Sequence, residues 1–262
     1  MARKSEKGVR KNMKKKIYID AGHGGDSIGA SYKGRLEQDD VLKLSLAVGK
    51  LLKTQPNIEV KYSRTTNVNP DLTGRCKEAN KWSADYFISI HRDACAPNVA
   101  QGVTGYVYSK VETNGTTYNK AKTIVDNLAN AAGFKNRGVK RGAVSYADFA
   151  VNRVTNMSSV LLEVGFIDSD KDNRIFDEMF EEMALAIAKG LCAAVGEKYV
   201  ILGDVNGDGK VDVSDARQIL RYAVGLDIMN ENLKAIADIN GDGKVDVSDA
   251  REALRKATGL EK

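Results

Sequence analysis

The hydrophobic positions in the first two thirds of the chain form short apolar runs that alternate with longer amphipathic segments. The short runs have the length of buried strands, whereas the longer segments repeat apolar residues with the helical period. We predict strands at 17–20, 58–62, 86–90, 103–108 and 160–162, and helices at 38–53, 72–83, 117–132 and 174–195. Strands that alternate with helices predict an α/β fold, in which helices flank a mostly parallel twisted sheet.

Composition and charge exclude several classes of protein. The chain has 262 residues, of which 42% are hydrophobic and 29% charged, so it can bury a substantial core. Only 3 prolines argue against a disordered or fibrous chain, and 3 cysteines, an odd number, exclude a disulfide framework. The net charge of +5 gives no sign of nucleic-acid binding, and the glycine-rich turn at 22–25 lacks the Lys-Ser/Thr of a phosphate loop.

Charge is distributed unevenly between the two ends of the chain. Residues 1–16 hold eight Lys/Arg and one Glu, whereas residues 201–262 hold nine Lys/Arg and twelve Asp/Glu. We expect a basic leader at 1–15, with attraction to an anionic surface as an alternative to a simple solvated terminus. No apolar run follows the basic residues, so no signal peptide is recognised, and no membrane span is expected. Release by another route, as for a lysin, and an export signal outside this sequence are both left open.

The two histidines of the chain both follow predicted strands. His23 and His91 lie at the strand ends where α/β sheets tend to form their sites. With Glu37, which opens the first long helix, they make a common ligand set for catalytic zinc. Zinc lowers the pKa of bound water to about 7, and a further carboxylate must then accept the proton of that water. Glu163 fits, because a lone carboxylate after an apolar run is costly unless it is used or paired.

Spacing alone leaves an alternative open, in which the histidines are turn residues and Glu163 is a salt-bridge partner. The surrounding motifs run in order as Asp20-Ala-Gly-His-Gly-Gly25, Glu37, Ser89-Ile-His-Arg92 and Leu162-Glu-Val-Gly-Phe-Ile-Asp168. They resemble the zinc-dependent N-acetylmuramoyl-L-alanine amidases (the amidase-3 family). Shorter motifs that also resemble the family are Ser63-Arg64-Thr65, Arg75 and Ala79-Asn80.

This resemblance implies hydrolysis of the amide between the lactyl group of N-acetylmuramic acid and L-alanine in peptidoglycan, at the cell wall outside the cell. It also implies that His23, Glu37 and His91 hold zinc and that Glu163 is the catalytic acid/base. The sequence departs from the family pattern at Ala21, Asp26, Asn67 and Arg92-Asp93. The last departure puts stem-peptide preference in doubt, and a local surface ion pair between Arg92 and Asp93 is as good an interpretation as a substrate role.

A repeat occupies the C-terminal end of the chain. The segment Asp204-Val-Asn-Gly-Asp-Gly-Lys-Val-Asp-Val-Ser-Asp215 recurs 34 residues later as 238–249. Oxygen side chains at positions 1, 3, 5 and 12, a glycine at position 6 and a backbone carbonyl at position 7 are the pattern of a calcium loop. The expected ligands are Asp204, Asn206, Asp208, Lys210 (carbonyl) and Asp215 in the first loop, and Asp238, Asn240, Asp242, Lys244 (carbonyl) and Asp249 in the second. Asp212 and Asp246 could contribute through water.

Each loop is followed by one helix, and the doubled unit resembles a type I dockerin. The resemblance implies a small all-α module that binds two Ca²⁺ and a cohesin-type protein partner. Its contact positions would be Val213, Ser214, Leu220, Arg221, Val247, Ser248, Leu254 and Arg255, although packing between the two helices is an equal interpretation for the two leucines. We predict a catalytic domain at 16–196, a short linker at 197–202 and the dockerin-like module at 203–262.

Two other interpretations of function remain. In one, the chain is chiefly a scaffold-docking protein with a weak hydrolase domain. In the other, the zinc centre is a peptidase that cuts a different bond. Of the cysteines, Cys192 is predicted to be a buried apolar residue, whereas Cys95 lies four residues after His91 and is either near the site or a plain free thiol.

Overall fold

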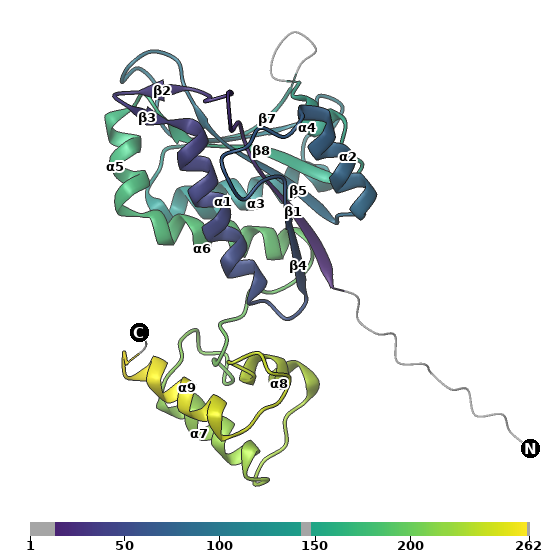
Figure 1. The fold of residues 1–262 in the computed structure, drawn as a ribbon, viewed down its shortest axis with the longest axis vertical. Coiled ribbons are helices and arrows are strands. Elements are labelled where there is room, and N and C mark those ends of the chain that lie inside the picture. Colours follow the sequence, from purple (N-terminus) through teal and green to yellow (C-terminus); the bar gives the residue numbers. More distant parts are fainter. Residues whose placement is uncertain (1–13, 143–147, 261–262) are drawn as a thin grey trace, which may run out of the picture.

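The computed structural model describes residues 14–142 and 148–260. The predicted basic leader therefore lies outside the described residues except for its last two, and the first strand begins at Lys15, within it. The chain forms a larger domain and a smaller C-terminal module (Figure 1). No helix within the described ranges is long and apolar enough to cross a membrane.

The larger domain is built on a six-stranded sheet with the strand order β4-β1-β5-β8-β6-β7. Every neighbouring pair is parallel except β6 and β8, which are antiparallel. The mostly parallel sheet predicted from the sequence is therefore confirmed. Its strands are β1 (Lys15–Ala21), β4 (Ile58–Tyr62), β5 (Tyr86–Asp93), β6 (Val103–Val107), β7 (Asn136–Arg141) and β8 (Ser158–Phe166).

Helices cover the two faces of this sheet unequally (Figure 1). One face carries the main core, which includes Ile19, Ile88 and Leu162. The helices packed there are α1 (Glu37–Lys53), α3 (Thr116–Ala132) and α6 (Phe180–Ala194). The other face has a smaller cluster, which includes Phe87 and Leu161, beneath α2 (Leu72–Trp82) and α4 (Ala150–Arg153). On this second face, the side chains become polar towards the carboxyl ends of β5 and β8.

Two features of the larger domain differ from the prediction. Strands β5 and β8 continue past His91 and Glu163 instead of ending there. The helix predicted at 174–195 is two helices, α5 (Asp170–Glu178) and α6, which are separated at Met179. Phe176 and Phe180 on either side of this break have ring centroids 5.9 Å apart, so the pair still presents one apolar face.

The sequence analysis also missed four short or polar elements. Strand β7 is a polar edge strand, and α4 is a single turn too short to show a helical period. Two-residue strands β2 (Ser31–Tyr32) and β3 (Arg35–Leu36) form a small hairpin before α1.

The C-terminal module contains α7 (Val213–Ala223), α8 (Glu231–Ala237) and α9 (Val247–Ala257). Helices α7 and α9 follow the two predicted calcium loops and pack against each other, with Ile219 and Ala253 fully buried between the elements of the module. The all-α module is as predicted, whereas α8, which precedes the second loop, was not foreseen.

The segment that joins the two parts is fastened to the larger domain. The side chain of Gln55, just after α1, is 3% exposed. Its Nε2 donates to the carbonyl of Val200 over 3.0 Å, and its Oε1 accepts from the Val200 amide over 2.8 Å. Asn57 donates in addition to Glu197 over 3.2 Å. The linker between the two parts is therefore fixed to the larger domain and is not a flexible tether.

Candidate metal centre and active-site groove

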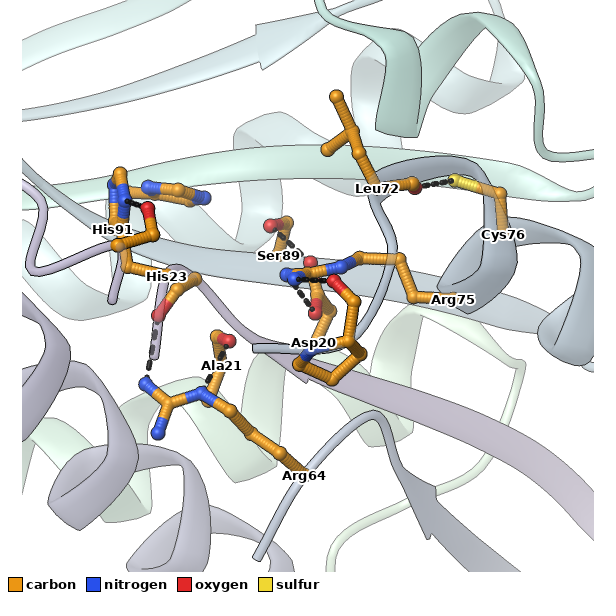
Figure 2. A network of polar contacts seen from close by, with 12 residues as sticks. Asp20, Ala21, His23, Arg64, Leu72, Arg75, Cys76, Ser89 and His91 are labelled. Carbon is orange, nitrogen blue, oxygen red and sulfur yellow. Dashed lines mark hydrogen bonds and ion pairs between the residues drawn. The ribbon is translucent and has the colours of Figure 1, made fainter. Parts of the chain in front are cut away.

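His23, Glu37 and His91 come together although 68 residues of chain separate the first from the last. The Glu37 Oε1 atom lies 3.2 Å from Nε2 of His23 and 2.9 Å from Nδ1 of His91. The two imidazole rings have centroids 4.9 Å apart (Figure 2). Each of the three residues offers one possible ligand atom, and these atoms lie within 4.8 Å of one another. Among the described residues, this is the one such group of three or more His, Cys, Asp or Glu side chains.

Glycines give these three side chains the room to meet. His23 itself has φ of 58°, a left-handed conformation that is strained for any residue but glycine and is typical of functional sites. A Cβ atom on Gly22 would lie 2.3 Å from the ring of His91. A Cβ atom on Gly29 would lie 2.5 Å from Oε2 of Glu37 and 2.8 Å from the His23 ring. Both glycines are therefore required by the close approach of the ligands.

Neighbouring polar groups orient the ligands. Ser27 Oγ lies 3.1 Å from Nδ1 of His23, which leaves Nε2 directed at Glu37. The Glu37 carboxylate accepts from the backbone amides of Ala30 over 2.8 Å and Arg92 over 3.0 Å. Burial acts against ionisation of Glu37, but contacts with the two histidines outweigh it and hold the pKa of Glu37 below its ordinary range. Two imidazoles and one ionised carboxylate, each supported by a second partner, fit a zinc site.

Two buried arginines hold the loop that carries His23 (Figure 2). Arg64 donates to the carbonyls of Ala21 over 3.0 Å and Gly22 over 2.7 Å, and it also reaches the start of α1. Arg75 pairs with Asp20 over 2.8 Å, and the second oxygen of Asp20 accepts from Ser89 over 2.6 Å. Both arginines belong to the short motifs singled out in the sequence. Arg64 therefore holds the backbone that follows β1, and Arg75 holds the end of β1, beneath the candidate metal centre.

Glu163 lies on β8 directly beside His91 of β5, because the two residues are register partners. The side chain is 9% exposed, and its Oε2 has no hydrogen-bond partner among the described residues. Burial, with the negative charges of Asp93 and Glu37 nearby, raises the pKa of Glu163 well above the ordinary carboxyl value. A buried, unpaired carboxyl group next to a metal centre is suited to proton transfer. The salt-bridge interpretation of Glu163 is therefore wrong.

The interpretation of Arg92 and Asp93 as a surface ion pair is also wrong. The guanidinium of Arg92 is buried, contacts Asp40 and donates to Asn173 over 2.7 Å. It lies 4.4 Å from the ring centroid of Phe176. Asp93 instead lines the groove with Glu163, and burial raises the pKa of Asp93. Adjacent residues of a strand point to opposite faces, which accounts for the separation of the two side chains.

A groove of about 620 Å³ opens over the metal centre. Its polar side carries His23, Glu37, His91 and Glu163. Its other wall is largely apolar and is formed by Leu72 on α2, Phe149 and Val151 around α4, and Leu161 on β8. The sequence analysis did not find this wall, since α4 gives no periodic signal. Cys95 is exposed and is not among the residues that line the groove.

The two predicted calcium loops have closely matching hydrogen bonds. Asp204 at position 1 accepts from three backbone amides of its own loop at 2.8–3.1 Å, and Asp238 does the same in the second loop at 2.9–3.1 Å. Asp215 and Asp249 at position 12 are fully buried and accept from amides at the start of their loops. These contacts curl each loop around its carboxylates.

Other positions of the C-terminal module have distinct roles. Asp212 and Asp246 are the N-caps of α7 and α9, each accepting from the serine amide two residues further on. Leu220 is 41% exposed and Leu254 is 44% exposed, which disfavours their interpretation as core residues of the helix pair. Val213 and Val247, at the helix starts, are also exposed.

Two histidines and a carboxylate meet at the carboxyl edge of a mostly parallel sheet, open to a groove, in an α/β domain whose site could hold a metal ion. The profile of the N-acetylmuramoyl-L-alanine amidase family matches residues 17–193, and that of the type I dockerin domain matches residues 202–254. The chain belongs to the N-acetylmuramoyl-L-alanine amidase family and carries a dockerin domain. It is an enzyme that hydrolyses an amide bond of peptidoglycan.

Individual relatives agree with this assignment. The chain is 36% identical over 182 residues to the N-acetylmuramoyl-L-alanine amidase CwlM of Bacillus licheniformis, which covers 68% of each chain. It is 31% identical over 188 residues to the endolysin of Bacillus phage SPP1, covering 71% of this chain and 68% of the endolysin. Among solved structures, an N-acetylmuramoyl-L-alanine amidase from Clostridium difficile 630 has a TM-score of 0.64 at 29% identity, covering 70% of this chain and 97% of the other.

Proposed function

We propose that His23, Glu37 and His91 hold a zinc ion and that Glu163 transfers the proton during amide hydrolysis. The bond is the one between the lactyl group of N-acetylmuramic acid and L-alanine. The observation that carries the proposal is the convergence of the three ligands beside an unpaired, buried Glu163 at the floor of one groove.

Each residue has a separate task in this mechanism. When bound, zinc would supply Lewis-acid polarisation of the amide carbonyl and a lowered pKa for the attacking water. Glu163 accepts a proton from that water and then donates it to the departing amine of alanine. The raised pKa of Glu163 suits this role, because the carboxyl group can hold the accepted proton until the amine departs. The apolar wall at Leu72 and Phe149 excludes water from one side of the groove and positions substrate.

The test is the identity of the new amino terminus released from purified cell walls. We expect alanine, with clearing of the wall suspension lost in the presence of a zinc chelator and restored by added zinc. A different terminal residue would identify a peptidase, and clearing that survives complete removal of metal would contradict the zinc centre.

We propose further that the C-terminal module binds two Ca²⁺ and docks to a cohesin-type protein. The loops present their predicted ligands in a matching arrangement, and the expected contact residues Val213, Leu220, Val247 and Leu254 are exposed. Replacing Leu220 and Leu254 together by aspartate is expected to weaken binding to an immobilised cohesin at least tenfold, because two apolar contacts are lost. The matched control is the exposed Leu226→Asp, which lies outside the predicted contact positions. Equal binding by the double variant and the wild type would contradict this surface.

Attachment and catalysis are compatible in this arrangement. The metal centre lies at the carboxyl ends of β1 and β5, whereas Figure 1 shows the module near the end of the domain where β1 begins. The hydrogen bonds between Gln55 and Val200 fix the linker and keep the module at that end of the domain. The groove therefore remains open to its substrate while the module is attached to a partner.

A further inference from the structure

One buried hydroxyl group has no place in the mechanism described so far. Thr104 lies on β6, and its register partner across the antiparallel pair is Glu163 of β8. Glu163 is in turn the register partner of His91 on β5. Directly paired residues project from the same face of a sheet, so three neighbouring strands place His91, Glu163 and Thr104 in one row. This row lies on the face that carries the groove.

The Thr104 side chain is completely buried, and its Oγ1 has no hydrogen-bond partner among the described residues. The Oε2 atom of Glu163 beside it also has none. A buried polar atom without a partner destabilises a protein, and a role in catalysis is one explanation for such an atom beside an active site. One of these groups is a hydroxyl donor and the other is a carboxyl acceptor, and they lie on adjacent strands. This arrangement indicates that the two groups function together.

The position of Thr104 separates it from the substrate. Glu163 lines the groove, whereas Thr104 does not. The hydroxyl therefore lies behind the carboxyl group, on the side away from His91. Directly opposed side chains on antiparallel strands have Cβ atoms about 5 Å apart, so rotation of the two side chains brings a hydroxyl within reach of a carboxylate.

We propose that Thr104 is a positioning residue for Glu163. Its hydroxyl donates a hydrogen bond to the Glu163 carboxylate during the reaction and fixes that group for proton transfer. The inference rests on the proposed role of Glu163 as acid/base. It assigns to β6, which pairs with β8 in the antiparallel sense, a direct part in the chemistry.

The test compares Thr104→Val, which keeps the shape and removes the hydroxyl, with Thr104→Ser, which keeps the hydroxyl. On a soluble muramyl peptide, we expect Thr104→Val to lower kcat about 10- to 100-fold with little change in KM, because one hydrogen bond to a charged group is lost. Thr104→Ser is expected to retain most of kcat. The melting temperature of Thr104→Val is expected to equal or exceed that of the wild type, since an unpaired buried hydroxyl is removed.

Ser45→Ala is the matched control, because Ser45 on α1 has a fully buried hydroxyl without a partner on the opposite side of the sheet. It is expected to leave kcat unchanged. A wild-type kcat for Thr104→Val, or an equal loss in the valine and serine variants, would overturn the inference. If Glu163→Gln is inactive while Thr104→Val is fully active, only the role of Thr104 fails, whereas an active Glu163→Gln removes the acid/base proposal itself.

Discussion

Replacement of Glu163 by glutamine is expected to lower kcat by about 10²- to 10⁴-fold, the usual contribution of a positioned acid/base. Glutamine has nearly the same shape as glutamate and can neither accept nor release a proton near neutral pH. The three metal ligands are unchanged by this substitution, so the zinc content of the purified variant should equal that of the wild type. The measurement is the initial rate of alanine-terminated product release, together with metal analysis of the same preparation.

The wild type and Glu163→Gln should differ in how their stability depends on pH. In the metal-free protein, burial raises the pKa of Glu163 well above the ordinary carboxyl value. The native state then holds this proton more tightly than the unfolded chain, so its contribution to stability is present below the ordinary carboxyl pKa and is lost as pH rises through the native pKa. Glu163→Gln lacks this loss. We expect it to be at least as stable as the wild type at neutral pH when both are measured in chelator.

Glu178→Gln is a matched control, since Glu178 is an exposed residue at the end of α5. Its rate should equal that of the wild type. A Glu163→Gln variant that retains zinc and clears walls at the wild-type rate would show that another group transfers the proton. Asp93, which lines the same groove, would then be the next candidate.

The sequence was sufficient to single out the four residues that the structure brings together, because His23, His91 and Glu163 each follow a short apolar run and Glu37 opens the first long helix. Glycines in those motifs are explained only by the structure, where Gly22 leaves room for a ring from another strand. The row of His91, Glu163 and Thr104 could not be predicted in this way. It depends on strand order and register, and β6 joins β8 in the antiparallel sense although most of the sheet is parallel.

The errors have a related cause. Sequence patterns identify apolar runs well but do not show where a strand ends, so the predicted strands stop before His91 and Glu163, whereas β5 and β8 continue past them. A surface ion pair is one of two interpretations that the sequence allows for Arg92, because a charged residue is seldom fully buried. The structure gives it buried partners on α1 and α5, which are distant in sequence. The break between α5 and α6 was also missed, because both helices contribute to one continuous apolar face.

The C-terminal module is expected to depend on calcium for most of its stability. Each loop gathers several aspartates, and in the absence of a cation their negative charges repel one another. A ligand that binds only the folded state stabilises it by about 2.7 kcal/mol at a concentration 100 times its Kd, and two sites add their effects. Calorimetry of the full chain should therefore show one transition that moves to a higher temperature with added calcium and a second, from the catalytic domain, that does not.

Asp208→Ala combined with Asp242→Ala gives the sharpest variant for this prediction. These residues occupy position 5 of the two loops, are exposed, and each accept from one backbone amide of their loop. Asp204 and Asp215 each accept from three backbone amides, so their replacement would disturb the loop more and confound the result. The double variant should melt near the calcium-free temperature of the wild type whether or not calcium is present. Glu231→Gln, on an 88% exposed side chain outside the loops, should keep the full response. A calcium-induced shift of equal size in the double variant and the wild type would place the bound ion elsewhere, and no shift in the wild type would contradict calcium binding by this module.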